Sequence, residues 1–287
     1  MKLTTLHRFK LFSLALAEAN KKELKVLWAF TPATKVYGQK LGFTVFPDSM
    51  QSFRGIWGKP TPQYFTQFPG NRLYQLVKYF FYRMRSASLG GRFRSLKRSA
   101  SYAASLLTYE VTDILKQPDD LQKLYGRLRE QYPGLVHVDP NPKYMDWRIK
   151  NNPNLTYVTQ YFYANGALAG YYIYALKDHA VNLTDLTFLD TRVADILFCH
   201  LLDGMRRSGK TDFHYFGNKE NPINRYTFRL FEKIGGTLSP ASDLPFVFRV
   251  YGDMHHGQPI PGLQDHPSLS NPSNWYLNGM WTEGYNF

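Results

Sequence analysis

The chain has 287 residues, of which 44% are hydrophobic and 16% aromatic, and it carries a formal net charge of +13. This composition is typical of a packed globular protein and excludes a disordered one. The single cysteine, Cys199, excludes an internal disulfide framework and a cysteine-rich zinc site. No stretch approaches the roughly 20 apolar residues of a membrane span, so we expect a cytoplasmic protein.

The first predicted elements alternate between helix and strand. Apolar spacing predicts an amphipathic helix over 5–20, although basic residues ahead of its short apolar run leave a secretion signal as the alternative. A buried strand is expected over 24–30. A second helix begins after Thr31, which suits an N-cap, with Pro32 at its first position. One or two strands are expected over 44–57.

The segment 58–107 is predicted to be a basic connector that contains an aromatic-rich helix over 72–86. Neither Asp nor Glu occurs between Ser49 and Tyr109. Such a positive field attracts polyanions, so we expect the basic segment 54–98 to meet either an anionic membrane surface or tRNA. A solvated basic face is the alternative. The basic residues of this segment are Arg54, Lys59, Arg72, Lys78, Arg83, Arg85, Arg92, Arg94, Lys97 and Arg98.

A second globular pattern is predicted from residue 108 onward. Two runs rich in aromatic and β-branched residues flank Asn165 and Gly166, which predicts a β-hairpin over 155–176. The residues from 253 to 287 are rich in Pro, Asn and His, and we expect them to wrap the surface as a coil. The remaining predicted elements are helices over 119–133, 143–149, 193–210 and 222–234, and strands over 180–190, 211–217 and 243–252.

Two stretches, 11–43 and 197–236, have the same order of elements at similar spacing. Both end in a charged pair, an aliphatic residue and glycine, which indicates two copies of one α/β unit. The order helix, strand and Asn-x-x-Ala-x-x-x-Tyr-x-x-x-Gly-Phe resembles the second half of the GNAT acyltransferase fold. Residues 144–174 resemble the opening of GNAT-like proteins encoded with bacterial polysaccharide genes. The segment 271–284 is similar to their usual ending but lacks its Asp-Ser-Asp cluster.

The resemblance implies an α/β fold with a mixed sheet, built as a tandem GNAT-like protein with a truncated first copy. Its expected parts are a partial GNAT-like half at 1–57, the basic connector helix at 58–107, a more complete GNAT-like domain at 108–252 and a C-terminal coil tail at 253–287.

The resemblance also implies where acetyl-CoA or another acyl-CoA would bind, namely in an opening between the strands around 180–190 and 211–217. Tyr37 then stands at the position of the acid that protonates the departing thiolate, and Asp185 is the candidate base. The pattern is incomplete, because no glycine lies in the expected phosphate loop between Asp190 and Ile196, and Phe231 replaces the tyrosine of the second copy. No metal ligands are expected. The candidate cofactor-binding residues are Leu186, Thr187, Phe188, Arg192 and Asn224.

By this resemblance we expect an N-acyltransferase that moves an acyl group from acyl-CoA to a small-molecule amine. The acceptor would be an amino sugar, such as a nucleotide sugar, or another cell-surface precursor. The alternatives are a catalytically inactive GNAT scaffold that binds a partner or a membrane, and a transferase that uses aminoacyl-tRNA. The sequence leaves a homo-oligomer open.

Overall fold

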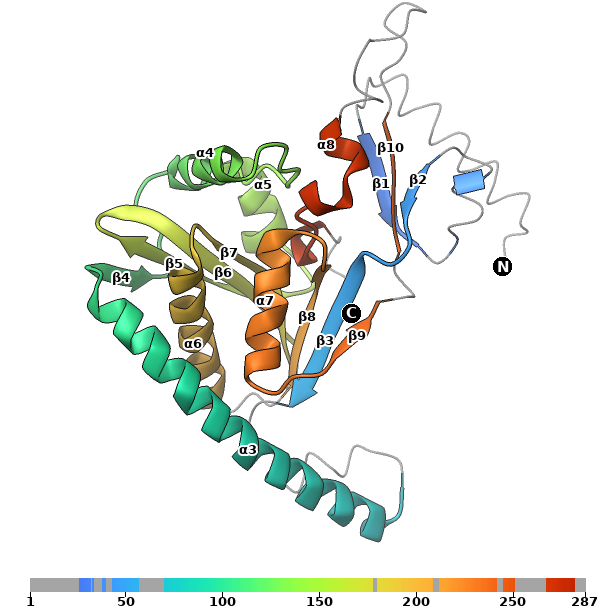
Figure 1. Ribbon diagram of the computed structural model, residues 1–287, viewed down its shortest axis with the longest axis vertical. Coiled ribbons are helices and arrows are strands. Elements are labelled where there is room, and N and C mark those ends of the chain that lie inside the picture. The colour runs from blue at the N-terminus through green and yellow to red at the C-terminus, as the bar shows by residue number, and fades with distance from the viewer. Residues whose placement is uncertain are drawn as a thin grey trace, which may run out of the picture. The chain divides into compact units, whose positions relative to one another are not determined.

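The computed structural model describes residues 26–31, 33, 38–39, 43–56, 70–177, 180–208, 212–241, 245–250 and 267–281. The chain divides into two compact units (Figure 1). One unit combines Met1–Met50 with Ser242–Asn271, and the other combines Gln51–Ala241 with Pro272–Phe287. The units therefore differ from the expected ranges 1–57 and 108–252. The predicted helix over 5–20 and the candidate acid Tyr37 lie outside the described residues.

The first unit contains an antiparallel sheet in the order β1-β10-β2. Its strands are β1 (Val26–Phe30), β10 (Phe246–Val250) and β2 (Thr44–Phe46). Phe246 is fully buried, and its ring centroid lies 5.4 Å from that of Phe30. The predicted strands in these places are confirmed. However, β10 pairs with β1 and β2, so it does not belong to the second sheet as the expected domain 108–252 required. A short helix, α8 (Pro267–Ser270), also belongs to this unit.

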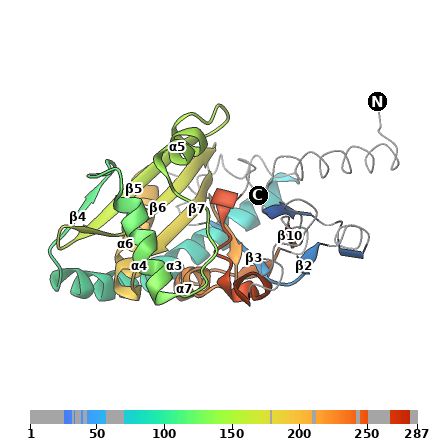
Figure 2. The same cartoon turned by 90° about the horizontal axis from the view of Figure 1, so that it is seen from above.

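The second unit is built on a seven-stranded mixed sheet in the order β4-β5-β6-β7-β8-β3-β9, whose strands β5, β6 and β7 are seen side by side in Figure 2. Neighbours from β4 to β7 are antiparallel, whereas β7 and β8 are parallel. This confirms the expected α/β class with a mixed sheet. The strands are β4 (Tyr109–Thr112), β5 (Thr156–Ala164), β6 (Ala167–Lys177), β7 (Ala180–Phe188), β8 (Asp212–Asn218), β3 (Met50–Ile56) and β9 (Leu238–Pro240).

The predicted hairpin is formed by β5 and β6. Asn165 and Gly166 at its turn have φ values of 51° and 79°. Two consecutive positive φ values define the type I′ turn that Asn-Gly favours, and the twist of this turn matches that of the paired strands.

Helices cover both faces of the second sheet. Because successive side chains of a strand point to opposite faces, Tyr171 and Tyr172 of β6 separate them. The Tyr171 hydroxyl meets that of Tyr125 on α4, at 2.9 Å, and the Tyr172 hydroxyl meets His200 on α6, at 2.9 Å. The helices of this unit are α4 (Asp120–Gln131), α5 (Pro142–Met145), the π-helical turn η2 (Asp146–Lys150), α6 (Thr191–Arg207), α7 (Pro222–Lys233) and the 3-10 turns η3 (Pro272–Asn274) and η4 (Gly279–Trp281).

The basic connector is one continuous helix, α3 (Arg72–Ser105), more than twice as long as predicted. Asn71 caps it by accepting a hydrogen bond from the Tyr74 backbone N–H, at 2.9 Å. The second half of α3 packs beside α6, while the first half extends past α6 and α7 (Figure 1). The buried side chains of the second half recur at helical spacing, at Phe93, Leu96, Ala100 and Ala103.

Candidate functional site

The parallel strands β7 and β8 pair with each other over their first halves only. Their pairing runs from Ala180 opposite Asp212 to Leu183 opposite Tyr215 and stops there, although both strands continue. A bulge at Thr184 coincides with this point, because Tyr174 of β6 pairs with Leu183 and Ile173 pairs with Asp185. Bulges bend a strand and increase its twist. The structure thus contains a parallel pair that splays, as the resemblance implied.

The chain's own C-terminal segment lies in this opening. Trp275, Tyr276, Leu277 and Asn278 are almost completely buried, and η4 contacts both β7 and β8. The approach is close, since a Cβ atom at Gly279 would lie 2.9 Å from the Thr184 Cα. The expectation of a surface coil over 253–287 is therefore wrong for residues 275–281. An apolar segment of this kind is stable only when its side chains leave water.

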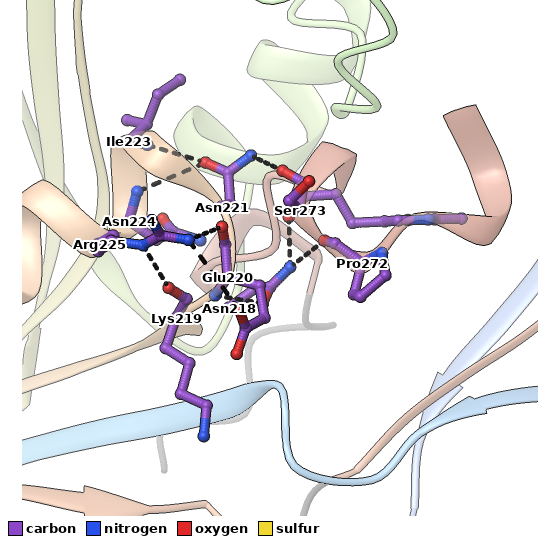
Figure 3. Close-up of polar contacts among 10 residues, drawn as sticks. Asn218, Lys219, Glu220, Asn221, Ile223, Asn224, Arg225, Pro272 and Ser273 are labelled. Carbon is purple, nitrogen blue, oxygen red and sulfur yellow. Dashed lines mark hydrogen bonds and ion pairs between the residues drawn. The ribbon is translucent and has the colours of Figure 1, made fainter. Parts of the chain in front are cut away.

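Three buried asparagines fix the segment in place (Figure 3). Asn218 at the end of β8 donates to the carbonyl groups of Pro272, at 2.6 Å, and Trp275, at 2.8 Å. Asn221 donates to the Ser273 carbonyl, at 3.0 Å, and its oxygen also caps α7 by accepting from two backbone N–H groups. If the segment moved away, these buried amide groups would lose their hydrogen-bond partners, which costs free energy. The contacts therefore hold the segment in place.

Asn224, a candidate cofactor ligand, is the third of these residues. Its amide nitrogen donates to the Leu277 carbonyl, at 2.7 Å, and its oxygen accepts from the Tyr215 hydroxyl, at 2.7 Å. In this conformation the Leu277 carbonyl therefore accepts from the Asn224 amide group, which the resemblance assigns to acyl-CoA binding.

Asp185 lies at the centre of the opening with only 1% of its surface exposed. Its Oδ2 accepts from the Tyr171 hydroxyl, at 2.6 Å. Its Oδ1 accepts from Tyr276, at 2.5 Å, from Asn278, at 2.9 Å, and from Thr187, at 3.0 Å. The described salt bridges do not include Asp185, so neutral donors alone satisfy this carboxylate. We call these five residues the Asp185 cluster.

The electrostatics of the cluster suit a proton acceptor. Burial raises the pKa of Asp185 to about 6, although the hydrogen bonds from Tyr171, Tyr276 and Thr187 act in the opposite direction. Burial and then the nearby Asp185 charge hold the pKa values of Tyr171 and Tyr276 well above the ordinary range, so both remain protonated donors. Asp185 also lines a pocket of about 10 Å³ with Tyr125, Tyr171 and Asn278. That volume is close to what one water molecule needs.

The N-terminus of α6 fits a phosphate group poorly. Asp190 caps this helix, and its Oδ1 accepts from the backbone N–H groups of Arg192, at 2.8 Å, and Val193, at 3.0 Å. These are donors that a pyrophosphate would use, and the carboxylate repels an anion. Arg192, the candidate phosphate ligand, is exposed and lies 3.6 Å from the Asp190 carboxylate.

The other candidate residues are dispersed. Leu186 and Phe188 are buried apolar side chains of β7, and Thr187 joins the Asp185 cluster. Phe231 stacks on Phe53 of β3 with ring centroids 4.2 Å apart, so it is part of the core and carries no proton to transfer. The catalytic and cofactor-binding roles of the candidate residues remain predictions.

Sequence reasoning missed four residues that build the site: Tyr171, Tyr276, Asn278 and Arg148. Arg148 is buried in the π-helical turn η2, where its guanidinium donates to the Gly279 carbonyl, at 2.9 Å, and to the Tyr157 hydroxyl. One signal was available in the sequence. The run Trp275-Tyr276-Leu277 is too apolar for an exposed coil, and it matched the ending of the resembled family.

No protein-family model matches the chain, and no curated protein matches its sequence. Solved structures with a similar fold include a GCN5-related N-acetyltransferase from Anabaena variabilis, at 13% identity and a TM-score of 0.47. The match covers 84% of this chain and 50% of that protein, so the chain spans half of that relative's length.

Two further matches are the C-terminal domain of a putative lysylphosphatidylglycerol synthetase from Agrobacterium fabrum and the PaiA N-acetyltransferase of Thermoplasma acidophilum in complex with coenzyme A. The first has 14% identity, a TM-score of 0.41, and coverage of 83% of this chain and 71% of that one. The second has 12% identity, a TM-score of 0.36, and coverage of 50% and 99%. Likenesses at this level assign no activity.

The described residues contain no group of three His, Cys, Asp or Glu side chains arranged to hold a metal ion. Among the helices in the described part of the chain, none is both long enough and apolar enough to cross a membrane.

Proposed function

We propose that the protein is a GNAT-type N-acyltransferase that moves an acyl group from an acyl thioester to an amine. The single observation that carries the proposal is the buried Asp185 carboxylate at the splay of β7 and β8, with its pKa raised to about 6. A general base is most effective when its pKa lies near the working pH.

In this reaction the amine nitrogen attacks the thioester carbonyl carbon, an amide bond forms and the carbon–sulfur bond breaks. The proton lost by the amine passes to Asp185 through a water molecule in the adjoining pocket. Tyr171, Tyr276 and Asn278 orient the carboxylate because their protons all point toward it. The departing thiolate takes up a proton and leaves as the free thiol. Tyr37, the acid that the resemblance implies, belongs to the first unit, and its role stays a prediction.

The donor is acetyl-CoA or another acyl-CoA, and the acceptor is an amino sugar, such as a nucleotide sugar, or a related cell-surface precursor. For an acyl-CoA to enter the opening, the C-terminal segment must release Asn224, and Asp190 must be displaced from the backbone N–H groups of α6. We therefore expect Asp190→Ser to strengthen acyl-CoA binding, since serine still caps a helix but carries no charge.

Thermal unfolding with acetyl-CoA, other acyl-CoA thioesters and CoA tests the proposal. A ligand present at 100 times its dissociation constant adds about 2.7 kcal/mol to the free energy of unfolding. Asp185→Asn should keep this stabilisation and lose acyl transfer to amino sugars. The half-exposed Asp146→Asn should retain both. The proposal fails if none of the thioesters shifts the unfolding temperature.

A second candidate function is a catalytically inactive scaffold that binds a partner. The buried C-terminal segment and the carboxylate cap of α6 favour it, because both occupy places that the resemblance assigns to acyl-CoA. Unfolding that is insensitive to every thioester would support this candidate. A transferase that uses aminoacyl-tRNA would instead show salt-dependent binding of charged tRNA.

A further inference from the structure

The first half of α3 exposes apolar side chains along one side of the helix. Leu73, Leu76, Val77, Phe80 and Met84 keep between 52% and 76% of their surface exposed. Their spacing of three and four residues places them on one face. We call these five residues the α3 stripe.

The α3 stripe points away from the body of the second unit. The second half of the same helix buries Phe93, Leu96, Ala100 and Ala103, and it does so beside α6. At about 100° per residue, the centre of the α3 stripe lies about 160° around the helix from this buried face. The stripe therefore does not extend the packed core, and Figure 1 shows the first half of α3 projecting past α6 and α7.

Positive charge borders the stripe on one side and aromatic rings border it on the other. Arg72 and Arg83 flank one side and the exposed aromatic residues Tyr74 and Phe81 the other. Arg94 and Arg98 continue the outward face along the second half. No acidic residue occurs anywhere in α3. An apolar strip beside basic and aromatic residues, on a helix without acidic ones, is the arrangement of a helix that lies in the interface of a membrane rich in anionic lipids.

We propose that the first half of α3 binds an anionic phospholipid bilayer, with the α3 stripe in the acyl boundary and the flanking cations at the headgroups. A second copy of the chain fits less well, because two such helices would bring only positive charges together. A single-stranded nucleic acid would use stacking rings, whereas four of the five stripe residues are Leu, Val or Met. The inference does not depend on acyl transfer.

Flotation with vesicles of phosphatidylcholine alone, or with phosphatidylglycerol added, tests the proposal on the full chain. The protein should float only with the anionic vesicles and should detach at high salt. The triple variant Leu76→Ser/Phe80→Ser/Met84→Ser should bind at least tenfold more weakly. Its matched control, Leu106→Ser/Ile114→Ser, removes equally exposed apolar residues outside the stripe and should bind normally.

Variants that lack basic residues measure the contribution of charge separately from that of the apolar α3 stripe. Arg72→Gln/Arg83→Gln should lose roughly fivefold in affinity for each charge removed. The control Lys143→Gln/Arg229→Gln removes two exposed charges that lie outside α3 and should lose much less.

A fluorescent label reports insertion directly. Cys199 is the only cysteine and is buried, so Met84→Cys supplies one accessible thiol for an environment-sensitive dye. Anionic vesicles should shift its emission to the blue, and a dye at Ile114→Cys should not respond. Equal responses at both positions, no binding to anionic vesicles, or normal binding by the triple variant would overturn the proposal, as would tRNA binding without lipid binding.

Discussion

The Asp185 cluster and the α3 stripe both hold side chains in an environment that their hydropathy disfavours. The cluster does so by burial of polar groups, and the stripe by exposure of apolar ones. The cluster buries a carboxylate, three hydroxyl groups and an amide inside the second unit. The α3 stripe leaves five large apolar side chains in water. Both arrangements cost free energy, since burial of polar groups and exposure of apolar surface are each unfavourable.

The two regions differ in how that cost is met. In the cluster, four donors converge on the Asp185 oxygens, so burial is compensated within the chain. The α3 stripe has no comparable compensation among the described residues. A buried polar network thus points to a function inside the protein, whereas an exposed apolar stripe points to a second component outside it.

The largest effect is expected from Tyr276→Ala. This change removes a buried ring and one donor to Asp185, which should lower the free energy of unfolding by about 3–5 kcal/mol. Phe80→Ala removes a ring of the same class from the α3 stripe and should have almost no effect. Urea unfolding of both variants measures the contrast. Equal losses of unfolding free energy would show that the α3 stripe is packed like the Asp185 cluster.

Asp185 should make stability depend on pH. Its pKa is raised in the folded protein to about 6 from 3.8, so the folded state holds the proton more tightly than the unfolded state. Stability from this group is therefore greatest below about pH 4 and falls by about 3 kcal/mol as the pH rises to 6. Urea unfolding across this range should show the slope in the native chain and not in Asp185→Asn. Asp146→Asn, the half-exposed control, should retain it.

Gly279→Ala tests how tightly the C-terminal segment fits between β7 and β8. The added methyl group would meet the Thr184 backbone at 2.9 Å, which should cost about 1–3 kcal/mol of stability. Gly126→Ala on α4 is the matched control, because nothing lies within 4 Å of its added Cβ. Thermal unfolding of the pair measures the difference, and an unchanged Gly279→Ala would mean that the segment packs more loosely.

The smallest effect on stability is expected from the triple variant of the α3 stripe. Exposed side chains away from caps and strained backbone usually change the free energy of unfolding by no more than about 0.5 kcal/mol. The variant should therefore unfold like the native chain in urea while losing its binding to anionic vesicles. A large loss of stability would place the stripe in the protein's own core.

Local chemistry explains the elements that the sequence analysis predicted correctly. Asn165 and Gly166 specify their turn without help from the rest of the chain. Asn221 and Pro222 likewise specify the start of α7, by capping and by the fixed φ of proline. The spacing of apolar residues was sufficient for β7 and α6.

The composition of the site depended on contacts between distant residues. The partners of Asp185 include Tyr276 and Asn278, which are 91 and 93 residues away along the chain. Periodicity within a window of residues carries no information about such pairs, so the tail was expected on the surface. The resemblance supplied Asp185 itself, but not the donors that set its pKa.

The position of β3 has a consequence for how the protein is made. This strand lies between β8 and β9 in the sheet, and Ser52 pairs with Ser239, which is 187 residues later. During synthesis β3 emerges early and must wait for nearly the whole second unit before its neighbours exist. Residues 108–252 expressed alone would lack this strand and leave β8 with an unpaired edge, which is a site for aggregation. Any fragment intended to fold should therefore begin upstream of Met50.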